Sequence, residues 1–149
     1  MREMIDCPFR AAESILTYLR HKTHIIFVDF HAEATSEKSG LAYYLDGKIS
    51  ALVGTHTHVQ TADERILPGG TAYISDLGMA GALNSMIGLK KEPVIQHFID
   101  QMPVRFAVDT QGPMVLSGVW VTVDVHTGKA THIERIRIVD HDITVGEEE

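Results

Sequence analysis

Residues 24–54 contain the pattern that most restricts the fold of this chain: two compact β-type runs separated by a segment with helical spacing. The first run, His24 to Phe30, is dense in Ile, Val and Phe, and the second spans Ile49 to Gly54. Between them, residues 34–45 have a polar start and stop before Gly47. A strand, helix and strand of this length predict a parallel pair joined by a right-handed crossover. The carboxyl ends of both strands then lie at the same edge of one sheet.

Histidines follow both of these strands. His31 comes directly after the first run, and His56 and His58 follow the second run in the sequence Gly54-Thr55-His56-Thr57-His58. Two histidines spaced i, i+2 on extended backbone point to the same side, with Cα atoms about 6.5–7 Å apart. Neutral imidazole nitrogen binds zinc, iron, manganese, nickel or copper. We therefore predict that the three histidines converge as metal ligands; the alternative for any single one is a hydrogen-bonded loop residue.

Carboxylates and hydroxyls beside these histidines are candidates for a supporting role. Asp29 alternates with His31 along the first strand, and Glu33 follows two residues later. Thr55 and Thr57 lie within the second histidine segment. Carboxylates at strand ends more often orient a neighbouring ligand than bind the metal themselves. We expect this orienting role, with direct coordination by Asp29 or Glu33 as the alternative.

The remaining sequence predicts a mixed α/β (α+β) fold. Further helices are expected at residues 8–21 and 93–102, and further strands at residues 71–76, 104–108, 114–125 and 132–139. The last three segments alternate apolar and polar residues, which is typical of antiparallel strands with one buried face. Residues 77–88, rich in Gly, Ala and Met, are expected to form a loop that either covers a site or is an ordinary surface loop.

Length and charge restrict the class of protein further. The chain of 149 residues has the size of one domain, predicted over 1–149 with residues 143–149 as a frayed acidic tail. A net charge of -7 disfavours stable binding of nucleic acid. Neither a membrane span nor a signal peptide is recognisable, and the lone Cys7 excludes an internal disulfide. We expect a cytoplasmic protein.

The chain resembles the C-terminal part of the YmdB-type metallophosphoesterases, a branch of the calcineurin-like phosphoesterase superfamily. The residues that carry the resemblance are 25–38, 53–62, 65–76 and 116–119. The segment from Gly54 to Thr61 has the extended form of the Gly-x-His-x-His element that is typical of this branch.

This resemblance implies a sandwich of two sheets flanked by helices and a site for two divalent metal ions, iron, manganese or zinc. His31 and His56 match ligands of one metal, and His58 matches a ligand of the other. The implied reaction is hydrolysis of cyclic nucleotide phosphodiesters, of the 2′,3′-cyclic or 3′,5′-cyclic AMP type, by metal-activated water. The implied partners are a small phosphodiester substrate and further copies of the chain in a homo-oligomer.

The sequence departs from the family in its other motifs. Members carry Gly-Asp-x-x-Gly, Asn-Gly-Glu-Asn and Gly-Asn-His-x-x-Asp motifs, which supply the remaining ligands, a bridging carboxylate and the catalytic histidine. Asn84 is the only asparagine of this chain, so neither asparagine motif is present. Three neutral imidazoles do not offset the repulsion between two divalent ions. We expect the C-terminal half of the domain, without a catalytic residue and with at most partial metal occupancy.

Two further interpretations remain open. The chain is a non-catalytic remnant that binds a metal or self-associates through an uncovered sheet edge, or it belongs to capsule-synthesis relatives with a similar late histidine motif. The sequence Thr55-His56-Thr57-His58 favours the YmdB-type branch. Amidohydrolases also use His-x-His, but this chain is too short for their barrel.

Overall fold

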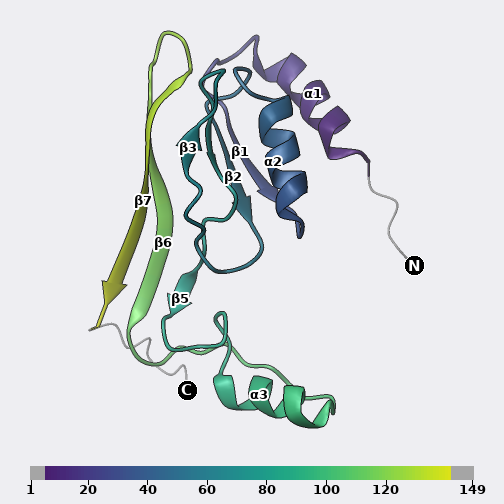
Figure 1. Cartoon of the computed structure of the whole chain (residues 1–149), viewed down its shortest axis with the longest axis vertical. Coiled ribbons are helices and arrows are strands. Elements are labelled where there is room, and N and C mark those ends of the chain that lie inside the picture. The colour runs from purple at the N-terminus through teal and green to yellow at the C-terminus, as the bar shows by residue number, and fades with distance from the viewer. Residues whose placement is uncertain (1–5, 142–149) are drawn as a thin grey trace.

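The computed structural model describes residues 6–141, which form three helices and seven strands (Figure 1). The helices are α1 (Pro8–Leu19), α2 (Thr35–Tyr44) and α3 (Lys91–Asp100). The strands are β1 (Phe27–His31), β2 (Ala51–Thr55), β3 (Arg65–Ile66), β4 (Ala72–Ile74), β5 (Ala80–Ala82), β6 (Met114–Val123) and β7 (Ala130–Asp140). The predicted acidic tail at residues 143–149 lies outside the described residues. No helix in the described part is long and apolar enough to cross a membrane.

The central sheet contains the predicted strand-helix-strand unit. Its strand order is β1-β2-β4-β3, in which β1, β2 and β4 are parallel and β3 is antiparallel to β4. The register pairs His31 at the end of β1 with Thr55 at the end of β2. The prediction of a parallel pair with both carboxyl ends at one edge is therefore confirmed.

A second, antiparallel sheet packs on one face of the central sheet. Its order is β5-β6-β7, and the long β6–β7 hairpin runs along the side of the molecule opposite α1 and α2 (Figure 1). Ala51, Ala72 and Ala130 form a small buried cluster between the two sheets. Such short side chains let the sheets approach closely, and the backbone N–H of Ala130 donates to the Gly70 carbonyl at 2.8 Å.

The larger core lies between the central sheet and the two helices on its other face. Leu16 of α1 and Leu41 of α2 are buried against Leu52 of β2 and Tyr73 of β4. The Tyr73 hydroxyl finds a partner in the Ser39 hydroxyl at 2.8 Å, so its polar atom is satisfied inside this core. The protein thus has helices, a mostly parallel sheet and an antiparallel sheet in successive layers, which confirms the predicted fold class.

Three sequence-based expectations about single elements are wrong. Residues 104–108 form no strand, because their only sheet-like contact is an isolated bridge between Leu89 and Val108. Residues 77–88 are not loop throughout, because Ala80–Ala82 pairs with β6 as β5. The strand β3, only two residues long, was not expected. Short strands like these are defined by a neighbour that satisfies their backbone, so their own residue pattern carries little signal.

Gly54 allows the layers to meet at the carboxyl end of β2. A Cβ atom at this position would lie 1.9 Å from the carbonyl oxygen of Ser75 and 2.7 Å from Cδ of Lys38. Neither the neighbouring backbone nor the buried Lys38 stem leaves room for a methyl group. Glycine is therefore required here for packing rather than for an unusual backbone angle.

We predict that Gly54→Ala destabilises the protein by at least about 2 kcal/mol, because an overpacked site must displace backbone. The matched control is Gly118→Ala in β6, where no atom lies within 4 Å of the added Cβ. Because glycine weakens a strand interior, Gly118→Ala should leave the free energy of unfolding unchanged or raise it slightly. Urea unfolding of both variants measures the difference, and equal midpoints would contradict the packing argument.

Candidate functional site

His31 and His56 lie next to each other at the carboxyl edge of the central sheet. Their imidazole rings are 5.3 Å apart between centroids and inclined by 79°. The β1–β2 register brings them together, because His31 pairs with Thr55 and His56 is the next residue. Both side chains are exposed. The sequence-based expectation that histidines of the two strands meet at one edge is met by this pair.

A chain of hydrogen bonds fixes the orientation of His31. Thr55 Oγ1 donates to Asp29 Oδ1 at 3.0 Å and lies 3.2 Å from His31 Nδ1. Since the single hydroxyl proton of Thr55 is given to Asp29, Thr55 can only accept from His31, and the His31 proton resides on Nδ1. His31 Nε2 is then left as a free lone pair. Asp29 and Thr55 thus contact His31 through hydrogen bonds, and their expected role beside a metal ligand stays a prediction.

His58 occupies a different position from the one expected. Strand β2 ends at Thr55, and His58 adopts a left-handed backbone with φ of 62°. The i, i+2 spacing on extended backbone was therefore the wrong geometry, because the chain turns away from the strand before His58. Its Nδ1 lies 2.9 Å from the carbonyl oxygen of Ile87. A carbonyl oxygen only accepts, so the His58 proton is on Nδ1 and its Nε2 is also a free lone pair.

The structure does not assemble these groups into a finished metal site. Within residues 6–141, no group of three or more His, Cys, Asp or Glu side chains has an arrangement that could hold a metal ion. In the same part of the chain no hydrogen bond or ion pair joins Glu33 to the three histidines. The metal ligands His31, His56 and His58 thus stay a prediction, of which the structure shows one close pair.

A buried ion pair that sequence reasoning missed supports the loop that carries His56 and His58, called the histidine loop below. Lys38 of α2 is 1% exposed, and its Nζ donates to Asp76 Oδ2 at 3.1 Å. The same oxygen accepts the backbone N–H of Thr57 at 2.8 Å, and Asp76 Oδ1 accepts the N–H of Gly78 at 3.0 Å. Asp76 is the last residue of the strand predicted over residues 71–76, which was the available signal for a carboxylate at this edge.

The environment of Asp76 favours its ionised form. Burial opposes ionisation, but the hydrogen bonds from the Thr57 and Gly78 backbone and from the Lys38 ammonium outweigh it and lower the pKa of Asp76. The carboxylate therefore stays charged at neutral pH and holds the residue between the two loop histidines in place. Thr57 Oγ1 donates to the Val59 carbonyl at 2.9 Å, and the expected supporting role of the Thr57 side chain stays a prediction.

The far end of the histidine loop is tied to the second sheet. Gln60 Nε2 donates to the carbonyl oxygens of Gly118 in β6 at 2.7 Å and of Ile136 in β7 at 3.2 Å. These contacts explain how a loop that follows the central sheet is also positioned by the antiparallel sheet.

Two of the remaining histidines contact backbone carbonyls away from this edge. His24 Nε2 lies 2.6 Å from the Val125 carbonyl, and His97 Nδ1 lies 2.8 Å from the Met102 carbonyl. His126 and His132 are exposed on and beside the β6–β7 turn.

Comparisons with known proteins place the chain in a family. The YmdB-like protein family matches residues 1–136. This chain belongs to the YmdB-like family. Over 136 residues it is 52% identical to a 2′,3′-cyclic-nucleotide 2′-phosphodiesterase of Bacillus subtilis (strain 168), a match that covers 91% of this chain and 51% of that relative. The chain spans about half the length of the curated relatives it matches.

Two crystal structures share the fold. A hypothetical protein from Thermus thermophilus superposes with a TM-score of 0.84 at 38% identity, over 93% of this chain and 53% of that one. A novel phosphatase from Mycoplasma pneumoniae superposes with a TM-score of 0.84 at 39% identity, over 95% of this chain and 50% of that one. The described fold is thus shared with proteins about twice as long.

We predict that Asp76→Asn destabilises the protein by roughly 3–5 kcal/mol at pH 7, because it leaves the Lys38 charge buried without a counter-charge. The folded pKa of Asp76 lies below the value of about 3.9 for an unfolded aspartate. The wild-type carboxylate therefore contributes stability above about pH 4, and this contribution is lost as pH falls through the folded pKa. Asp76→Asn should accordingly show a flatter loss of stability below pH 5 in urea unfolding.

The double variant Lys38→Met with Asp76→Asn tests the pairing itself. If the two charges stabilise each other, the double variant should be more stable than the sum of the two single changes implies. Additive losses of unfolding free energy would show that the pair is not coupled.

Proposed function

We propose that this chain forms the histidine-bearing part of a metal-dependent phosphodiesterase site, with His31 and His56 as ligands of one divalent metal and His58 as a ligand of a second. The observation that carries the proposal is the contact of Nδ1 with an oxygen in both His31 and His58. Both rings donate from Nδ1 to an oxygen, which leaves Nε2 free toward a metal. A ligating histidine is commonly held by a hydrogen bond from its other ring nitrogen.

The chemistry of the donors suits iron, manganese or zinc, which accept neutral imidazole. When bound, such metals polarise a phosphoryl group and activate a water molecule for attack. The residues of this chain would contribute position: Thr55 and Asp29 hold the His31 proton on Nδ1, and the Lys38–Asp76 pair holds the loop that carries His56 and His58. These groups provide no proton donor or acceptor of their own to the reaction.

The proposed substrates are cyclic nucleotide phosphodiesters. The name of the Bacillus subtilis relative, 52% identical, supports the 2′,3′-cyclic type. The 3′,5′-cyclic type rests on the family resemblance alone. Homo-oligomer formation is likewise a proposal that rests on that resemblance.

The three histidines would need anionic ligands from elsewhere, because neutral imidazoles cannot balance two divalent charges. We propose that these come from the part of the family fold that the relatives have beyond the matched region. Two surface features support this arrangement. Strand β1 is the edge of the central sheet, and Phe27 on it is 53% exposed. Beside it, Ile15 and Leu19 of α1 line a mainly apolar cavity of about 340 Å³ that reaches β1.

A second candidate function is that of a metal-binding or self-associating module without turnover. The same unpaired edge of β1 favours it, because an open edge can pair with the β1 of another copy. The two candidates differ in the activity of the isolated chain with added metal.

We predict that the 149-residue chain binds Mn²⁺ or Zn²⁺ weakly and that His56→Ala with His58→Ala lowers the affinity at least tenfold, because two imidazole ligands are removed. His126→Ala with His132→Ala, which removes two exposed histidines elsewhere, is the matched control and should change little. Calorimetric titration measures the affinity. Undiminished binding by the His56/His58 double variant would contradict the assignment, and robust hydrolysis of bis-p-nitrophenyl phosphate by the pure chain would contradict the dependence on further ligands.

The orienting role of Thr55 gives a separate prediction. Thr55→Val keeps the shape of the side chain but removes the oxygen that accepts from His31 Nδ1–H, so metal affinity should fall about tenfold. Thr131→Val on β7 is the control, since that hydroxyl is exposed and far along the chain from the site. Nitrogen NMR of His31 should show a mixture of tautomers in the Thr55 variant. A single Nδ1–H tautomer in that variant would overturn the role of Thr55.

A further inference from the structure

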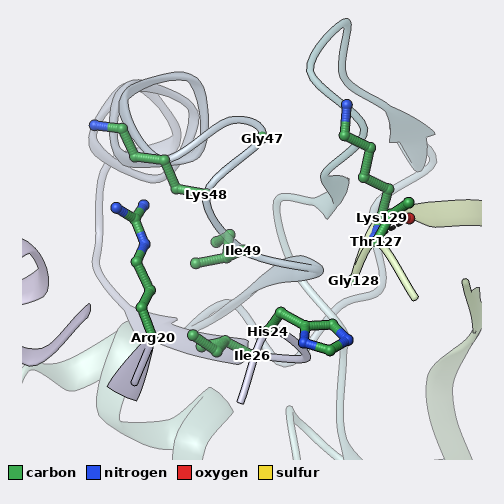
Figure 2. A pocket seen from close by; sticks show the side chains of 9 residues that line it. All are labelled: Arg20, His24, Ile26, Gly47, Lys48, Ile49, Thr127, Gly128 and Lys129. Carbon is green, nitrogen blue, oxygen red and sulfur yellow. Dashed lines mark hydrogen bonds between the residues drawn. The ribbon is translucent and has the colours of Figure 1, made fainter. Parts of the chain in front are cut away.

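A second concave site lies at the opposite edge of the central sheet from the histidines (Figure 2). Its floor includes Ile26 and Ile49, which precede β1 and β2, and its side wall is the turn between β6 and β7. The cavity measures about 380 Å³. The length of β1 and β2, at about 3.3 Å per residue, separates it from the histidine edge by roughly 15 Å. It is thus a different site from the one described above.

Cationic side chains dominate this cavity. Arg20 follows α1, Lys48 precedes β2 and Lys129 belongs to the β6–β7 turn, and no lining residue is acidic. Arg20 and Lys48 lie on one side of the cavity, with their charged ends near each other, while Lys129 lies on the opposite side (Figure 2). Within residues 6–141, none of the three forms an ion pair. In a chain with a net charge of -7, this is a local concentration of uncompensated positive charge.

The acidic group that borders Arg20 and Lys48 is engaged with Tyr44. Glu13 borders a neighbouring hollow together with Arg20 and Lys48. Its carboxylate accepts a hydrogen bond from the Tyr44 hydroxyl, and this bond raises the pKa of Tyr44. The Lys48 ammonium lies 4.7 Å from the centre of the Tyr44 ring rather than on the carboxylate. The cations of the cavity therefore keep their capacity to bind an anion.

The walls are fixed before any ligand arrives. Ser50 Oγ donates to the Gly128 carbonyl at 2.6 Å, and His24 Nε2 donates to the Val125 carbonyl at 2.6 Å. Gly128 has φ of 73°, and a Cβ there would lie 2.1 Å from the His24 carbonyl oxygen. The β6–β7 turn is thus clamped against the segment that leads into β1. A preorganised cavity loses less conformational entropy on binding.

We propose that this cavity binds a small organic phosphate whose phosphate group is held by Arg20 and Lys48. A guanidinium fork matches phosphate oxygens, and an ammonium group suits a second negative charge. The apolar floor of Ile26 and Ile49 offers contact to the organic part. The volume lies at the small end of the range found for sites of small molecules. The proposal does not depend on the activity proposed for the histidine edge.

Titration of the metal-free 149-residue chain with AMP, followed by amide NMR, tests this assignment. Saturable shifts should gather at residues 47–49 and 127–129, and adenosine, which lacks the phosphate, should produce none of them. Arg20→Gln with Lys48→Gln should weaken AMP binding at least tenfold. The matched control, Lys90→Gln with Lys91→Gln, removes two exposed charges at the start of α3 and should stay within twofold of the wild type.

A further control separates the two sites. The His56→Ala, His58→Ala double variant should bind AMP as the wild type does, because the cavity lies at the other edge of the sheet. Three results would each overturn the proposal. They are loss of AMP binding in the His56/His58 variant, equal weakening by the Arg20/Lys48 and Lys90/Lys91 variants, and adenosine binding as tight as AMP binding. Since Arg20 and Lys48 make no buried contact, NMR dispersion of their variant confirms the fold in the same experiment.

Discussion

The parallel pairing of β1 with β2 is the interaction on which the rest of this structure depends. Its register sets His31 opposite Thr55, so the hydroxyl that orients one histidine belongs to the strand that delivers the next. The same pairing leaves the amino ends of both strands together at the other edge, where the cationic cavity opens. One backbone alignment therefore creates two chemically opposite edges, one rich in neutral nitrogen donors and one rich in positive charge.

Electrostatics reinforces this division. The buried Lys38–Asp76 pair lies directly beneath the histidine loop, where a carboxylate that accepts two backbone N–H groups fixes the loop without adding net charge. The charge balance of a two-metal site would thus depend on carboxylates that the three histidines do not supply, whereas three cationic side chains line the opposite cavity.

Much of this could be predicted from the sequence where a pattern is long or repeated. The strand-helix-strand unit at residues 24–54 and the long alternating segments of β6 and β7 were recognisable because their periodicity extends over many residues. The two-residue strand β3 and the bridge at Val108 were not, because a partner strand rather than local sequence decides them. The site shows the same limit. The meeting of His31 and His56 follows from register, but the turn at His58 and its contact with the Ile87 carbonyl involve backbone that no side-chain pattern encodes.

The contact between His58 and Ile87 has a consequence for the mechanics of the proposed site. His31 is the last residue of β1 and His56 directly follows β2, so both lie next to sheet hydrogen bonds that allow little displacement. His58 instead rests against the connection between β5 and α3, in which Ile87 also has a left-handed backbone, with φ of 50°. Two metal ions bound as proposed would therefore be held with unequal stiffness. One would have a fixed anchor, and the spacing between the ions would adjust through the other.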